Sequence, residues 1–154
     1  MADAPSDRDT IAMIHATSIG TWAGEMGIAL LRASRDEVVA EIALRPIHRQ
    51  PYGIVHGGVH AGLIETVASI GAALDVMPHG RSVVGLENHT SFIRAVREGS
   101  RHAVAKPLTR GRKTQVWEVE VRDDSGRLAA TGRVRLLVLE AGAEIAGETV
   151  AVRG

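Results

Sequence analysis

Apolar residues in the middle of the chain recur at the three- and four-residue spacing of one helical face. They are Leu63, Val67, Ile70 and Leu74. The neighbouring face is apolar or small as well, and a helix that is apolar nearly all round lies inside a protein. A glycine-rich turn precedes this helix, and Pro78 and Gly80 close it. The pattern therefore predicts one long buried helix within residues 50–75.

Alternation of apolar and polar residues predicts strands before and after this helix. The expected strands, in chain order, are 25–33, 37–44, 82–93, 101–108, 113–122 and 127–139. Residues 34–36 form a tight turn between the first two, and the segment Asp123-Asp124-Ser125-Gly126 is a strong hairpin signal.

The two ends of the chain carry weaker patterns. A short amphipathic helix is expected near the start, with Asp7 or Asp9 as its N-cap. Residues 1–6 and the tail from Glu140 are expected to be loosely structured. We expect the whole chain to form a single domain whose core spans about residues 24–139.

Short turns force neighbouring strands to run antiparallel. One antiparallel sheet can cover a single apolar helix by curving around it. The expected fold class is therefore α+β, a curved antiparallel sheet wrapped around one long central helix. The edges of such a sheet stay open, and pairing with a second copy of the chain is the usual way to cover them.

Composition narrows the possible functions. The 154 residues carry 18 basic and 18 acidic side chains, and this balance argues against a general nucleic-acid binder. Aromatic residues make up only 3%, too few for a platform that stacks single-stranded bases. The chain has no cysteine, which excludes disulfides, thiolate zinc sites and a cysteine nucleophile. We see no N-terminal leader and no apolar run near the length of a membrane span, so a cytoplasmic location without membrane contact is expected.

Glu65 is the one carboxylate within the central apolar helix. An ionised group without a partner is expensive to bury in an apolar interior. Ser69 follows four residues later and therefore lies on the same side of the helix. Glu65 could lie on a partly solvent-exposed edge of the helix, it could be neutralised by an arginine, or it could take part in a reaction.

The turn His56-Gly57-Gly58 leads directly into the helix. Bare backbone N–H groups at the positive end of a helix dipole form a natural site for an anion or a polarised carbonyl. The alternative is a tight turn that needs glycine for its backbone angles. An oxyanion site and a carboxylate two turns further along are parts that an acyl-transfer enzyme needs.

Three blocks of this sequence resemble the hotdog-fold acyl-CoA thioesterases. They are Gln50-Pro51-Tyr52-Gly53-Ile54-Val55-His56-Gly57-Gly58 with Glu65, Asn88-His89-Thr90-Ser91-Phe92-Ile93-Arg94 with Glu98-Gly99, and Val116-Trp117-Glu118-Val119 with the hairpin 122–128. The likeness is strongest to the branch whose helix carries Glu, which includes 4-hydroxybenzoyl-CoA and 1,4-dihydroxy-2-naphthoyl-CoA thioesterases. Phenylacetate-pathway thioesterases are more distant.

The resemblance implies a homodimer with two active sites at the interface, often as a dimer of dimers. It assigns the oxyanion N–H to Gly57 and the positioning of the thioester to Gln50 and His56. Glu65 of the other subunit would attack the carbonyl as nucleophile or activate a water, with Ser69 assisting. It implies no cofactor, because CoA is part of the substrate.

The resemblance also implies residues that bind the CoA part of the substrate. They are Gly58, Arg94, Arg112, Lys113 and Thr114. Arg112 and Lys113 replace smaller hydroxyl residues of the family, and arginine binds phosphates bidentately. No metal site is expected, since His56 and His60 would share a helical face only if the helix began at His56. We take His60 as a surface or packing residue.

The expected function is hydrolysis of acyl-CoA to the free acid and CoA, and the expected substrate is an aroyl- or arylacetyl-CoA. One alternative is a non-catalytic acyl-CoA-binding hotdog module, although such regulators usually add a DNA-binding segment that this chain lacks. Another is a hotdog enoyl-thioester hydratase or dehydratase, for which the characteristic His-Phe-Pro-Gly block is missing.

Overall fold

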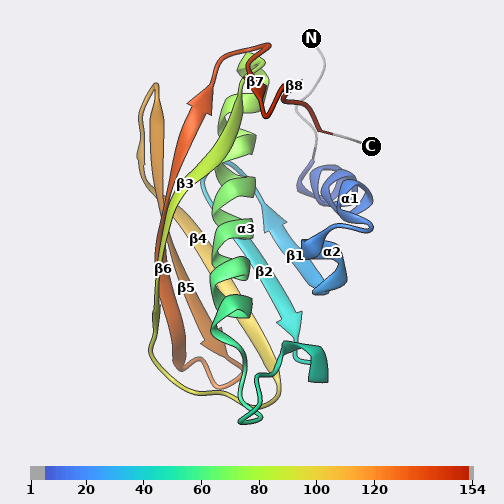
Figure 1. Ribbon diagram of the computed structural model, residues 1–154, viewed down its shortest axis with the longest axis vertical. Helices are drawn as coiled ribbons and strands as arrows, with labels where there is room; N and C mark the ends of the chain where they lie inside the picture. The colour runs from blue at the N-terminus through green and yellow to red at the C-terminus, as the bar shows by residue number, and fades with distance from the viewer. Residues whose placement is uncertain (1–5, 153–154) are drawn as a thin grey trace.

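A six-stranded antiparallel sheet curves around one long helix in the computed structural model, which describes residues 6–152 (Figure 1). The helices are α1 (Asp7–Ser18), α2 (Trp22–Glu25) and α3 (Gly57–Val76), with 3₁₀ turns η1 (Pro46–His48) and η2 (Met77–His79). The strands are β1 (Ile28–Ala33), β2 (Val38–Ala43), β3 (Ser82–Phe92), β4 (Ser100–Arg110), β5 (Thr114–Asp123), β6 (Leu128–Leu139), β7 (Glu144–Ile145) and β8 (Glu148–Thr149). The predicted fold class is confirmed.

The strand order in the large sheet is β1-β2-β4-β5-β6-β3. Strand β3 pairs on one side only, with β6, from Ser82 opposite Leu139 to Phe92 opposite Ala130. Within residues 6–152 no strand pairs with its other side, so β3 is an open edge of the sheet.

Helix α3 lies in the concave side of the sheet and supplies much of the core (Figure 1). Nine of its residues are buried, among them Leu63, Ile64 and Val67. Trp117 of β5 is fully buried and lies where a Cβ on Gly71 would be, so the ring packs directly on the helix backbone. The close approach explains why a glycine occurs in the middle of a helix, where it is normally unfavourable.

Hydrogen bonds fix the C-terminal half of α3 against the sheet. The Trp117 indole N–H donates to Gln115 Oε1 at 2.8 Å, and Gln115 Nε2 donates to Asp75 Oδ2 at 2.8 Å. Asp75 also forms an ion pair with Arg35 at 2.8 Å. The polar side-chain groups of Trp117, Gln115 and Asp75 all have partners, so α3 is a rigid support for the polar residues in its other half.

By length and composition alone, residues 57–79 would pass as a membrane-spanning helix, because an 18-residue stretch within them has a mean hydropathy of 1.3. The expectation that no apolar run approaches that length is therefore wrong. Half of this stretch is buried inside the protein. The core helix of a water-exposed domain meets the same criterion, so the apolar character of α3 follows from its packing on the sheet.

Two elements near the N-terminus differ from the sequence prediction. Helix α2 was not predicted: the Thr21 side chain accepts the Gly24 N–H and caps a single helical turn that ends at Glu25, so β1 begins at Ile28 and not at residue 25. The N-cap of α1 is Ser6, which accepts the Asp9 N–H, and neither Asp7 nor Asp9 takes that place. The remaining residues predicted as a loose N-terminus, 1–5, lie outside the described residues.

The tail also differs from the expectation. Residues beyond Glu140 form a two-stranded hairpin, in which Glu144 pairs with Thr149 and Ile145 with Glu148. The other predicted strands are confirmed within two residues of their ends, and the turn at 34–36 is closed by the Ser34 N–H donating to the Glu37 carbonyl.

We expect the substitution Gly71→Ala to lower the free energy of unfolding by about 1–3 kcal/mol, because the added methyl overlaps the Trp117 ring. Urea denaturation followed by circular dichroism measures the change. Helix propensity alone predicts the opposite sign, a gain of up to about 1 kcal/mol. A stabilised variant would therefore contradict the packing described here.

Candidate active site

The first turn of α3 presents a backbone N–H without an acceptor. His56 is the N-cap: its Nδ1 accepts the Gly58 N–H at 2.8 Å, and its carbonyl accepts the Val59 N–H at 2.9 Å. The N–H of Gly57 has no hydrogen-bond partner within the described part of the chain. The cap orients the turn, and the helix dipole adds positive potential at this free donor.

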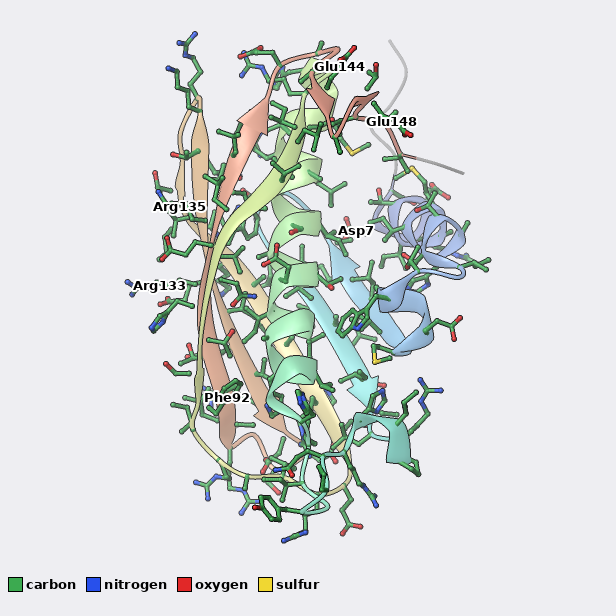
Figure 2. All side chains as sticks on the ribbon, viewed as in Figure 1. Asp7, Phe92, Arg133, Arg135, Glu144 and Glu148 are labelled. Carbon is green, nitrogen blue, oxygen red and sulfur yellow. The ribbon has the colours of Figure 1, made fainter. Side chains whose placement is uncertain are left out.

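A pocket of about 320 Å³ opens beside Gly57. Its walls include Gln50, Phe92 and Arg94, so the structure brings three of the predicted site positions (50, 57 and 94) together. Gln50 Oε1 accepts the Tyr52 N–H at 2.9 Å, which holds the side chain in the turn. Phe92 lies at the lower end of β3 (Figure 2), and its ring lies 2.8 Å from the position a Cβ on Gly57 would take.

Glu65 lies eight residues further along α3 and is half-buried. Asn88 of β3 donates to its Oε2 at 3.2 Å, and Ser69 donates to its Oε1 at 3.4 Å. Thr90 donates to Asn88 Oδ1 at 2.7 Å, and Asn88 also donates to the Ala61 carbonyl, so the amide is held in place. No arginine or lysine forms an ion pair with Glu65 among residues 6–152. An arginine of the same chain therefore does not neutralise Glu65 within the described residues.

Gly57 and Glu65 of one chain do not share a site. Eight residues of α-helix separate them by about 12 Å along the axis, and Glu65 is absent from the walls of the pocket beside Gly57. Glu65 instead lies next to the open edge strand, where its Oε1 fills the place of a Cβ on Gly85.

The turn carrying Arg112, Lys113 and Thr114 lies at the other end of the molecule from this pocket. Its position follows from Arg110, which approaches Asp75 at the C-terminal end of α3 with an N–O distance of 3.6 Å. The 20 residues of α3 extend over about 30 Å. Within one chain, therefore, these three residues cannot reach a ligand bound beside Gly57.

His60 is a pocket residue that the sequence did not indicate. It is only 4% exposed and lines the pocket with Gly57 and Phe92. Burial, helped by the positive charge of Arg101, lowers the pKa of His60 from 6.5 to about 4. In the sequence, only its position three residues after Gly57 could have indicated that His60 lies in the pocket. Its burial comes from strands that are distant in the sequence.

Comparison with known proteins identifies the family of this chain. The family model of the thioesterase superfamily matches residues 52–130. A protein of Mycobacterium tuberculosis named as an esterase is 41% identical over 119 residues, 76% of this chain and 85% of the relative. The proofreading thioesterase EntH of Cronobacter sakazakii is 36% identical over 130 residues, 84% of this chain and 94% of the relative.

Solved structures of similar proteins also include thioesterases. The structure of the M. tuberculosis protein superimposes with a TM-score of 0.76 at 40% identity, covering 78% of this chain and 97% of that one. A thioesterase from Haemophilus influenzae superimposes with a TM-score of 0.80 at 29% identity, covering 84% of this chain and 90% of that one. The chain therefore belongs to the thioesterase superfamily and is a thioester hydrolase.

Proposed function

We propose that this chain hydrolyses acyl-CoA, with aroyl- or arylacetyl-CoA as the substrate class, and releases the free acid and CoA. Glu65 acts as nucleophile or general base, and the Gly57 N–H stabilises the oxyanion. One observation carries this proposal. A free N–H and a carboxylate without a cationic partner lie on the same helix but too far apart to act on one carbonyl, so the complete site needs two copies of the chain.

The open edge of β3 is the place where a second copy would bind. An unpaired edge strand is a template for pairing, and a two-fold axis lets the same strand of two chains pair with itself. Leu86, Phe92 and Ile93 lie on or just after β3 and are exposed large apolar side chains. Pairing two such edges would cover them.

The register of this pairing supports a shared site. Glu65 touches Gly85, and Gly57 touches Phe92, so the two groups lie beside different ends of β3. A two-fold axis next to Asn88 would bring Gly85 of one chain opposite residues 91 and 92 of the other. Glu65 then approaches Gly57 of the partner subunit, and two equivalent sites form in the dimer.

In this site the thioester carbonyl oxygen accepts the Gly57 N–H, which stabilises the negative charge that develops on attack. If Glu65 is the nucleophile, its carboxylate displaces the CoA thiolate and water then hydrolyses the resulting anhydride. If Glu65 is the base, it takes a proton from the attacking water. In both cases one water is consumed, and the thiolate leaves as the free thiol after protonation. Ser69 and Asn88 hold the carboxylate in place.

The pocket beside Gly57 supports an aromatic or other bulky acyl group. Ile54, Phe92 and Ile93 give it apolar walls, and the Phe92 ring can stack on an aryl group. Arg94 at its rim is available to a CoA phosphate. Arg112, Lys113 and Thr114 could reach the same CoA only from another copy of the chain, either the dimer partner or a chain of a second dimer.

We expect Glu65→Gln and Glu65→Ala to lower kcat for benzoyl-CoA at least about 10³-fold, because the attacking or activating group is lost. Release of free thiol, followed with a thiol reagent, measures the rate. Glu118→Gln is the matched control, since the Glu118 carboxylate pairs with Arg133 at 3.2 Å, and Arg133 points away from α3 (Figure 2). Equal rates in all variants would exclude Glu65 from the reaction. Tight binding of benzoyl-CoA without turnover in the wild type would instead select the non-catalytic module.

Gly57→Pro removes the oxyanion donor while leaving the helix intact, because proline is well tolerated as the first residue of a helix. We expect kcat to fall by about 10²–10³-fold. Gly57→Ala is the matched control: it adds a Cβ against the exposed Phe92 ring but keeps the N–H, and the loss should be much smaller. Similar losses in both variants would mean that crowding, and not the missing donor, causes the effect.

Mixing the Glu65→Ala chain with the Gly57→Pro chain tests the shared site. In a mixed dimer one of the two sites keeps both Glu65 and the partner's Gly57, so the purified mixed dimer should show about half of the wild-type activity per dimer. The two variants are co-expressed with different tags, and the mixed dimer is purified for the thiol-release assay. No recovery in a confirmed mixed dimer would place both groups in the same chain and contradict the proposal.

A further inference from the structure

The C-terminal hairpin β7–β8 is a folded element that the proposed hydrolysis leaves without a role. It lies beyond residues 52–130, the segment that the family model matches. Ile145 of β7 pairs with Glu148 of β8. The chain enters the hairpin from Glu140, which forms an ion pair of 3.2 Å with Arg81, the residue before β3. The hairpin is therefore held near the N-terminal end of β3.

A hollow of about 430 Å³ lies between the hairpin and β3. Figure 1 shows β7 and β8 on the side of β3 away from β6, which is the open edge of the sheet. Ile145 forms part of the wall and is a large apolar side chain with 42% of its surface exposed. Val84 and Val150 add further apolar wall, and Glu148 and Thr149 are its polar members. The hollow thus offers a largely apolar surface to an apolar group.

The hollow begins next to the proposed reactive carboxylate. Val84 precedes Gly85, where Glu65 Oε1 fills the place of a Cβ, and one residue of a strand covers only about 3.3 Å. The Gly57 of the same chain lies much further away, because it touches Phe92, seven residues or about 23 Å along β3 from Gly85. Within one chain, the hollow therefore lies beside the carboxylate and far from the oxyanion donor.

The proposed pairing of two β3 edges brings the hollow to the acyl pocket of the other chain. In an antiparallel pair, each step toward the N-terminus of one strand meets a step toward the C-terminus of the other. Val84 therefore faces Phe92 and Ile93 of the other chain. These two residues line the pocket of about 320 Å³ beside Gly57. In the proposed dimer, the hollow of one subunit thus borders on the pocket beside Gly57 of the partner subunit.

We propose that the hairpin β7–β8 of the subunit that supplies Glu65 forms the distal wall of the acyl site, with Ile145 as a specificity-determining residue. The hollow holds the apolar end of an acyl group whose carbonyl is bound at Gly57 of the partner subunit. This inference rests on the proposed function, since it needs the paired β3 edges. The two adjoining spaces, of about 430 and 320 Å³, together fall within the range of small-molecule sites, about 300–1,000 Å³.

The consequence is that the hairpin sets the acceptable length of the acyl group. Acyl groups longer than one aryl ring reach Ile145 and gain contact with it, and shorter groups do not. Each methylene removed from water raises affinity about fourfold. Substrates that extend into the hollow are therefore favoured until it is filled, and longer ones are rejected by the hairpin.

The test measures kcat/KM by thiol release for straight-chain acyl-CoAs of 2 to 16 carbons and for benzoyl-, phenylacetyl-, 3-phenylpropionyl- and 4-phenylbutyryl-CoA. Ile145→Trp fills the hollow, so kcat/KM for the longest substrates that the wild type accepts should fall about tenfold or more, while acetyl- and benzoyl-CoA stay within about twofold. Ile145→Ala enlarges the hollow and should move the optimum to longer acyl groups. Ile19→Trp and Ile19→Ala are the matched controls, since Ile19 is 81% exposed at the C-terminal end of α1.

A mixed dimer shows which subunit contributes the hairpin. When a Gly57→Pro chain pairs with a Glu65→Ala chain, the complete site takes Glu65, and with it the hairpin, from the Gly57→Pro chain. Ile145→Trp on that chain should change the length profile, and Ile145→Trp on the Glu65→Ala chain should not. A changed profile with the second placement would overturn the proposal.

The same length profile in the wild type and both Ile145 variants would overturn the role of the hairpin while leaving the hydrolysis intact. An equal loss at every length, with dissociation in size-exclusion chromatography, would also overturn it, because the hairpin would then only hold the dimer together. Absence of hydrolysis for all substrates would instead count against the proposed function, and the Kd values of the same series with and without Ile145→Trp then decide the role of the hairpin. Thermal unfolding shows whether each variant is folded, and Ile145→Ala provides the decisive comparison if Ile145→Trp is not.

Discussion

Helix α3 holds two complementary groups that cannot meet within one chain. The free N–H of Gly57 and the carboxylate of Glu65 are separated by two turns, and the helix between them is buried against the sheet. A thioester carbonyl placed at Gly57 therefore needs its attacking group from elsewhere. The exposed edge of β3 lies beside both groups, so the fold that separates them also offers the surface that can reunite them in a dimer.

The rigidity of α3 makes such a shared site usable. Trp117, Gln115 and Asp75 fix the C-terminal half of the helix to the sheet, where every polar atom in their hydrogen-bond chain has a partner. The other half carries the unsatisfied groups. Glu65 receives hydrogen bonds from Asn88 and Ser69 that orient it without neutralising its charge. The half of α3 that is fixed to the sheet is thus separate from the half that carries the proposed reactive groups.

Periodic patterns allowed most of the fold to be predicted from the sequence. The apolar run of α3 and the alternation in β5, where Trp117, Val119 and Val121 are buried, depend only on local spacing. Helix α2 was missed because it is a single turn that depends on the Thr21 cap and on Trp22, whose ring packs where a Cβ on Gly62 would be. The candidate residues Glu65 and Gly57 followed from chemistry and motif. His60 did not, since its burial and missing partner arise from packing between segments distant in the sequence.

The two roles proposed for Glu65 would make different demands on the proposed dimer. One acceptor position on each oxygen is occupied, by Ser69 on Oε1 and by Asn88 on Oε2, and each oxygen keeps further acceptor capacity. A nucleophile must approach the carbonyl carbon to about 3–3.5 Å. A general base needs room for one water between the carboxylate and that carbon, which adds about one hydrogen-bond length of about 2.8 Å. The hydrogen bonds of Glu65 fit both roles, so in the proposed dimer the spacing of the two α3 helices across the paired β3 edges would select between them.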